Sequence, residues 1–344
     1  MDYTCRENNN FNLIRMIAAY MVIFAHATAI QGNGVDIIAR ITGQTHSGQM
    51  AVFIFTFLSG VFITKSVMNT NLKKFCKKRI CRLYPELILC LIVVLIIGSI
   101  FSTYSFKDYW FDPQVRKYFI ANLLEITNEH FLPGVFVDHP ATGAMNGVLW
   151  FITFEVRIYF LYGLLKSLKI FEDSIKSNIV LMLLLVWVIA EPSYVPFLGG
   201  SGELCGNANF PQYTITFLIA SLFYINFKEI NVKWEHLCIG LCLMYIFRHS
   251  SIAIWIWGAG FILFAMYFGT RKILLSIKIK DLSYGIFLYG WPIGQVVYEL
   301  FPTISAFYAA IITGIAATIV AFGSEKLIAA VSSMFKNIKG VKES

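Results

Sequence analysis

The chain has 344 residues, of which 57% are hydrophobic and 14% are charged, and its formal net charge is +8. Soluble proteins carry about 25% charged residues, so this chain has too few polar groups to cover a water-facing surface. Intrinsic disorder is also excluded, because it requires low hydrophobicity. The composition therefore indicates a polytopic membrane protein.

Ten stretches of the sequence are candidates for membrane-spanning helices, which need about 20 mostly apolar residues. They are 12–30, 50–68, 83–102, 147–165, 178–198, 211–227, 235–248, 251–269, 283–299 and 303–323. The sequence thus predicts an all-α protein of about ten transmembrane helices. We expect a single transmembrane domain over residues 1–344 with no fused soluble domain, and an external loop over about 103–146.

The Lys and Arg residues are distributed unequally between the two sides of this topology. Of the 28, 21 fall on the side that holds both termini, five fall on the other side, and Arg15 and Arg157 lie within spans. Loops rich in Lys and Arg stay in the cytoplasm, so both termini are predicted to be cytoplasmic. The positive net charge follows from this topology, and it indicates membrane lipid and not nucleic acid as the partner.

Two ionisable residues lie inside the first predicted span. Arg15 and His26 are eleven residues apart, which on a helix is three turns plus about 20°, so they share one face at a separation of about 16 Å. A His inside the membrane can exchange a proton near neutral pH, as a general base must. The alternative is a structural pair, with His26 hydrogen-bonded between helices and Arg15 reaching the lipid headgroups.

A second polar group lies in the span 147–165, which holds Trp150, Glu155, Arg157 and Tyr159. Glu155 and Tyr159 are four residues apart and share a helix face, whereas Arg157 points about 200° away from Glu155. A carboxylate in a membrane span needs a cation or a wet cavity. A purely structural ion pair is the competing interpretation.

A basic segment, KKFCKKRICRLYPE at 73–86, precedes the third span. Positive charge at the cytoplasmic end of a helix explains its lysines. Arg79 and Arg82, however, are three residues apart on one helix face, next to Pro85, where the chain re-enters the membrane. Two guanidinium groups on one face can bind phosphates bidentately, so this segment is a candidate site for a phosphate-bearing cosubstrate.

Six motifs follow one another along the chain: the Arg15-to-His26 spacing, FIFTFLSGVF with Ser59 and Gly60, Arg79 and Arg82 before Leu83-Tyr84-Pro85, LPGVF at 132–136, NGVLW at 146–150, and Glu155 with Arg157 and Tyr159. In this order they resemble the acyltransferase-3 family of integral membrane acyltransferases, and the resemblance covers nearly the whole chain. The ninth span, LSYGIFLYGWPIG, is similar to a stretch of the same family, although Gly290 stands where many members have a His, and no role is carried over to it.

The resemblance implies a membrane O-acyltransferase of the bacterial cytoplasmic (inner) membrane. The donor would be a cytoplasmic acyl-CoA, with acetyl-CoA favoured, and the acceptor a hydroxyl of a cell-surface or lipid-linked glycan. His26 would be the general base, with Arg15 as a second catalytic residue and no metal; direct transfer and an acyl-enzyme both stay open. The residues implied to bind the donor are Arg79, Arg82, Glu155, Arg157, Tyr159, Ser59, Gly60 and Trp150.

Three other functions remain as alternatives. A transporter or flippase for a polar or lipid-linked solute would also need charges inside the membrane, but it would not consume acyl-CoA. A structural component would use the same charges only to hold helices together. A different membrane acyltransferase fold would place its His in a later helix. Among the remaining histidines, His139 precedes Pro140 in the external loop, where it could contact the acceptor.

Overall fold

The structure is a computed structural model that describes residues 4, 9–125, 127–141, 143–192, 210–227, 229, 231–271 and 280–340, with side chains up to residue 334. Within these ranges it is helical, without a β-strand, so the all-α prediction is confirmed. The elements are α1 (Phe11–Gln31), α2 (Ile37–Thr42), α3 (Ser47–Asn69), α4 (Leu72–Phe101), α5 (Phe106–Phe111), α6 (Pro113–Leu124), α7 (Leu149–Ser167), the 3-10 helix η2 (Ile170–Glu172), α8 (Ser174–Ala190), α9 (Phe210–Asn226), α10 (Trp234–Ile246), α11 (Ala253–Gly269), α12 (Ser283–Leu300) and α13 (Ala306–Gly340).

Each of the ten predicted spans overlaps one of these helices. Four helices, α1, α3, α4 and α13, are long and apolar enough to cross a membrane, and α8, α10 and α11 are shorter apolar helices. The chain is thus a membrane protein, whereas the number of ten spans and the cytoplasmic termini stay predictions. The last part of the predicted span 178–198 lies outside the described residues.

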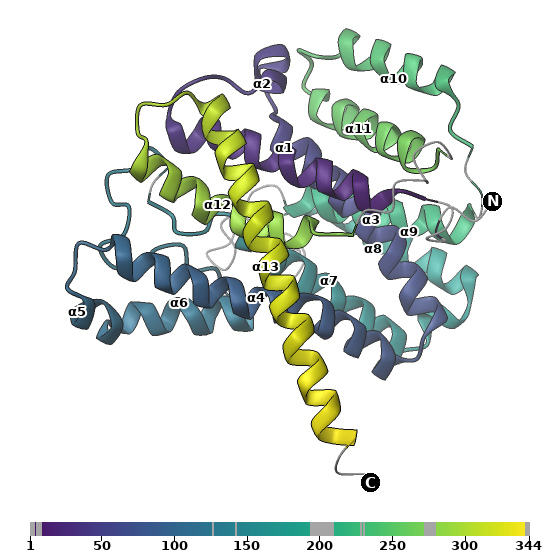
Figure 1. Cartoon of the computed structure of the whole chain (residues 1–344). Helices are drawn as coiled ribbons and strands as arrows, with labels where there is room; N and C mark the ends of the chain where they lie inside the picture. The colour runs from purple at the N-terminus through teal and green to yellow at the C-terminus, as the bar shows by residue number, and fades with distance from the viewer. Residues whose placement is uncertain are drawn as a thin grey trace.

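Helix α1 lies at the centre of the bundle and packs against α3, α12 and α13 (Figure 1). It runs antiparallel to α3, since Phe11 meets Phe62 while a Cβ on Gly48 would meet Ala25 at the other end. It ends at Gly32, whose φ of 63° is the left-handed conformation that commonly closes a helix. This central position brings both Arg15 and His26 into the interior of the bundle.

The stretch 103–146, predicted as a loop, contains two helices. Asp112 accepts a hydrogen bond from the backbone N of Gln114 at 2.7 Å, and Pro113 occupies the first position of α6. An Asp cap followed by Pro is a favourable helix start. Helix α6 packs against α4. After α6 the chain comes back to the end of α4, where Val135 and Ser102 form an isolated β-bridge. The segment therefore covers one side of α4 (Figure 1).

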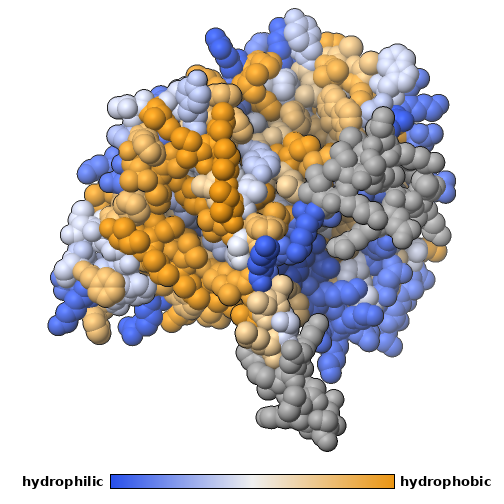
Figure 2. Space-filling model, in the orientation of Figure 1, coloured by the Kyte–Doolittle hydropathy of each residue, from blue (hydrophilic) through white to orange (hydrophobic). Residues whose placement is uncertain are grey.

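The surface carries the apolar stripes expected of helices that face lipid. In α4 the exposed side chains include Ile88, Ile92, Ile96 and Ile100, four residues apart. Helix α13 presents a similar stripe over 307–322. Figure 2 shows a broad hydrophobic area across the middle of the face that α13 crosses, with hydrophilic groups at its lower right. The lysines of the basic segment at the start of α4 are exposed.

Candidate functional site

A polar pocket lies between α1, α3, α4, α7 and α12. The space between its lining residues is about 490 Å³, part of which is open solvent. Arg82 is at its exposed part, with 49% of its side chain accessible, whereas Arg15 is at its buried part, with 10% accessible. The polar lining residues are Arg15, Ser59, Arg82, Glu155, Tyr159, Ser283 and Tyr284.

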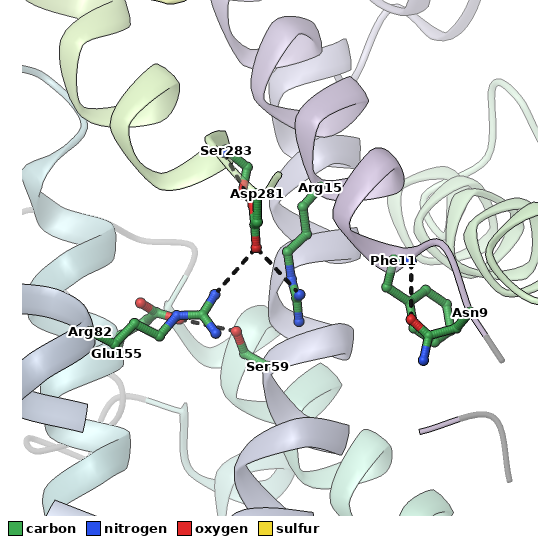
Figure 3. A network of polar contacts seen from close by, with 8 residues as sticks. All are labelled: Asn9, Phe11, Arg15, Ser59, Arg82, Glu155, Asp281 and Ser283. Carbon is green, nitrogen blue, oxygen red and sulfur yellow. Dashed lines mark hydrogen bonds and ion pairs between the residues drawn. The ribbon is translucent and has the colours of Figure 1, made fainter. Parts of the chain in front are cut away.

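Two guanidinium groups from different helices face one carboxylate beside this pocket. Asp281 Oδ2 lies 3.7 Å from Arg15 Nη1 and 3.9 Å from Arg82 Nη2 (Figure 3). Arg15 also lies over the ring of Phe62, 5.0 Å from its centroid. A cation–π contact and an ion pair both stabilise a buried guanidinium. The pocket thus combines two fixed positive charges with a route to solvent.

The opposite wall of the pocket is formed by α3 and α7. Ser59 Oγ donates a hydrogen bond of 3.0 Å to Glu155 Oε1 (Figure 3). Tyr159, one turn further along α7, has the Arg79 guanidinium 5.6 Å from its ring centroid. The structure therefore gathers five of the sequence-predicted residues around one cavity and places Arg79 behind Tyr159.

Three phenylalanines form an apolar layer one helical turn beyond the polar residues. The ring centroids of Phe55, Phe151 and Phe287 are 5.6 to 6.3 Å apart, and all three rings line the pocket. Four residues correspond to a rise of about 6 Å, so this aromatic layer closes the apolar end of the pocket. In each helix the phenylalanine is four positions from a polar lining residue: Phe55 from Ser59, Phe151 from Glu155, and Phe287 from Ser283.

His26 lies beyond the aromatic layer. The centroids of the His26 and Trp291 rings are 4.7 Å apart in an edge-to-face arrangement. Trp291 is one turn past Phe287 in α12. His26 lines a small second cavity with Ile23, Ala27, Ile30, Gln31, Gly290, Gly294, Ala309 and Thr313. Hence Arg15 and His26 share a helix face, as predicted, but line separate cavities.

The NGVLW motif fixes α12 next to His26. Asn146 donates from Nδ2 to the carbonyl of Leu288 at 3.1 Å, and it is fully buried. At Gly147 an added Cβ would lie 2.8 Å from the Trp291 ring, so only glycine allows this approach. Trp291 Nε1 donates in turn to the carbonyl of Ala144 at 2.8 Å. The motif therefore sets the position of the ring that His26 touches.

Four predicted donor-binding residues lie outside the lining of the polar pocket: Arg79, described above, and Gly60, Trp150 and Arg157. Trp150 stacks on Tyr213 of α9 at 5.6 Å, and the guanidinium of Arg157 lies 6.0 Å from the centroid of the Phe210 ring. At Gly60 an added Cβ would lie 2.7 Å from the carbonyl oxygen of Phe217. The last three positions therefore contact α9 in this structure.

His139 holds the segment after α6 onto α12. Its Nδ1 lies 2.8 Å from Gln295 Oε1 and its Nε2 lies 2.7 Å from Glu299 Oε2. Gln295 Nε2 donates to the carbonyl of Ala144 at 2.8 Å, which orients its Oε1 toward the imidazole. Both ring nitrogens therefore face acceptors in α12, so His139 lies buried between loop and helix.

Asp281, Ser283 and Tyr284 were not among the residues predicted from the sequence. Ser283 and Tyr284 line the pocket, and Asp281 faces its two arginines. The available signal was local: an Asp two residues before a Ser at the start of an apolar helix is typical of a capping residue. Among the described residues, no group of three or more His, Cys, Asp or Glu side chains could hold a metal ion.

The chain is similar in sequence to known proteins. A family model described as an acyltransferase domain matches residues 8–325. An O-acetyl transferase of Shigella phage Sf6 is 26% identical over 304 residues, covering 85% of this chain and 86% of the relative. Nodulation protein 10 of Rhizobium leguminosarum bv. viciae is 26% identical over 328 residues, covering 84% and 83%. No solved structure matches the chain.

Proposed function

The chain belongs to this acyltransferase family, and on that premise we propose that it transfers an acetyl group from acetyl-CoA to a hydroxyl of a surface or lipid-linked glycan. The family and the O-acetyl transferase relative support O-acyl transfer in a membrane. The observation that carries the donor assignment is the pair of guanidiniums, Arg15 and Arg82, at one solvent-connected pocket. Phosphates are the anions that such a pair recognises best.

In this proposal the polar pocket holds the phosphate-bearing part of the donor. Arg82 is the outer contact and Arg15 the inner one, because their exposures differ fivefold. Glu155 and Tyr159 line the same cavity and limit the positions that the donor can take. The separation of about 16 Å between Arg15 and His26 along the helix matches an extended pantetheine arm. In this structure the rings of the aromatic layer are in contact, so they must move apart for the arm to reach His26.

The chemistry takes place at His26. A ring nitrogen of His26 accepts the proton of the acceptor hydroxyl as its oxygen bonds to the thioester carbonyl carbon. The carbon–sulfur bond then breaks, and the CoA thiolate takes up the proton that His26 holds. The products are the acetyl ester and CoA. Trp291 fixes the imidazole from one side, and the small residues Gly290 and Gly294 leave room beside it.

We further propose that the donor enters from the cytoplasm and the acceptor from the opposite side of the bacterial inner membrane. The exposed lysines at the start of α4 lie next to the donor pocket in sequence, and such charges favour the cytoplasmic side. His26 lies about three turns deeper along α1, nearer to the other side. The thioester and the hydroxyl would therefore meet within the membrane.

The test uses the purified full chain in lipid vesicles with acetyl-CoA labelled in its acetyl group. Surface glycan from cells that lack the gene serves as the acceptor. We expect labelled ester on the glycan and an equal amount of free CoA. Movement of glycan or solute without consumption of acetyl-CoA would instead identify a transporter.

A further inference from the structure

Asp281 uses its two carboxylate oxygens for two different tasks. Oδ1 accepts hydrogen bonds from the backbone N of Ser283 at 3.1 Å and from Ser283 Oγ at 2.5 Å, at the start of α12. Oδ2 faces Arg15 and Arg82 (Figure 3). The bonds to Ser283 hold the carboxylate in place, so its charge lies between the two guanidiniums.

The distances show what the second oxygen contributes. Charge-assisted hydrogen bonds between a guanidinium and a carboxylate measure about 2.7–2.9 Å. At 3.7 and 3.9 Å, Asp281 supplies charge without directed hydrogen bonds to these nitrogens. Two guanidiniums close together repel each other, and the carboxylate of Asp281 offsets part of that repulsion, together with that of Glu155 in the same pocket. Asp281 is also 23% exposed, so it lies between the outer Arg82 and the inner Arg15 in accessibility.

We propose that Asp281 is a resident counter-ion of the donor pocket that weakens the binding of the phosphates of CoA. The proposal rests on the donor assignment made above. A phosphate that approaches Arg15 and Arg82 meets the fixed negative charge of Asp281, which competes for the same two cations. The same charge keeps the two guanidiniums side by side.

This arrangement has a consequence for turnover. The donor acetyl-CoA and the product CoA carry the same phosphates, so any group that binds phosphate tightly also retains the product. Product release limits the rate of many enzymes. By lowering the affinity for both molecules equally, Asp281 favours release of CoA after transfer, and it acts as a positioning and affinity-setting residue without touching the reacting atoms.

Asp281→Asn removes the charge and keeps an Oδ1 that can accept hydrogen bonds from Ser283. Asp281→Ser is also uncharged and keeps an acceptor oxygen, which provides a second variant should the first fold poorly. Glu172→Gln is the matched control, since it removes one negative charge from an exposed side chain in η2.

The measurement is the Kd for CoA, by calorimetry on the full chain in lipid nanodiscs. We expect both Asp281 variants to bind CoA about 5-fold or more tightly than wild type, the lower end of ordinary coupling between two sites. The gain should shrink at high salt and should be absent with pantetheine, which lacks the phosphates. Glu172→Gln should bind as wild type does.

Two results would overturn the assignment of Asp281. One is unchanged or weaker CoA binding in both Asp281 variants, which would show that the carboxylate orients the arginines. The other is an equal gain with pantetheine, which would make the effect independent of phosphate. If wild type itself binds no CoA, the donor assignment fails and this inference fails with it.

Discussion

Arg15 and His26 lie on one face of α1, yet the surroundings of the two side chains differ in charge and in access to solvent. Arg15 has Arg82, Asp281 and the Ser59–Glu155 pair nearby, in a pocket that is partly open to solvent. His26 is next to Trp291 and to uncharged side chains of α1, α12 and α13, among them Gln31 and Thr313. Long charged groups suit the binding of an anion, whereas a titratable ring among uncharged residues suits a reaction at a neutral group.

The aromatic layer separates these two regions. Phe55, Phe151 and Phe287 each lie one turn from a polar lining residue, and their rings touch one another. Under the proposed function, donor binding and acyl transfer are divided between the two ends of α1. Substitutions at either end should therefore change different measured quantities.

The largest effect is expected for His26→Gln. A general base contributes about 10²–10⁴-fold to rate, so transfer of labelled acetyl to glycan should fall by that factor. His249→Gln, an exposed His at the end of α10, is the control and should retain full activity. Wild-type transfer by His26→Gln at normal protein levels would remove His26 from the reaction.

A smaller effect is expected at the charged end. Hydrogen bonds to charged groups contribute about 1.5–3 kcal/mol, so Arg15→Gln should raise the Kd for CoA by about 10-fold or more. Arg82→Gln should have a weaker effect, because Arg82 is 49% exposed and exposed ion pairs contribute little.

The control for this pair is Arg116→Gln, which removes an exposed guanidinium from α6. Calorimetry with CoA provides the comparison. A larger loss of CoA affinity in Arg82→Gln than in Arg15→Gln would contradict the assignment of Arg15 as the inner and Arg82 as the outer contact. Wild-type affinity for CoA in both variants would show that these arginines do not bind the phosphates.

Gly290→Ala should act on the space beside His26. An added Cβ would lie 2.8 Å from Ile23 Cγ1, so the isoleucine must move toward the small cavity. One methylene in such a pocket changes discrimination by about 10-fold or more, and we expect transfer from propionyl-CoA to fall more than transfer from acetyl-CoA. The ratio of the two rates is the readout. An unchanged ratio would place the acyl group elsewhere.

The smallest effect on the site is expected for His139→Leu. It leaves the buried Gln295 Oε1 without the imidazole, and an unpaired buried polar group costs about 1–3 kcal/mol. Thermal unfolding should begin at lower temperature, while the affinity for CoA should stay unchanged. His249→Leu serves as the exposed control. A selective loss of glycan acetylation without loss of stability would point to acceptor contact instead.

The helical fold could largely be predicted from hydropathy, because apolar runs near the length of a membrane span leave few alternatives. Segment 103–146 was the exception: its helices α5 and α6 carry mixed polar faces, and only their starts, Ser105 with Asp108 and Asp112 with Pro113, mark them in the sequence. Helix α6 is stable because it packs on α4, and a contact between segments distant in sequence cannot be seen in local hydropathy.

The site could be predicted only in part. Arg15, Arg82, Ser59, Glu155 and Tyr159 meet at one pocket, in agreement with the family motifs. The motifs do not distinguish ligand contacts from helix packing, and Gly60, Trp150 and Arg157, which the resemblance groups with the donor site, contact α9 in the structure. Asp281 lies between segments and belongs to none of the motifs, so its place between two arginines emerged only from the fold.

The division of binding and chemistry is tested most directly by the Kd for CoA of the His26→Gln variant. The measurement uses the same preparation in which acetyl transfer has been lost. Because His26 lies beyond the aromatic layer from both arginines, we predict a Kd equal to that of wild type. A Kd that rises in proportion to the loss of transfer would contradict the separation of the two regions.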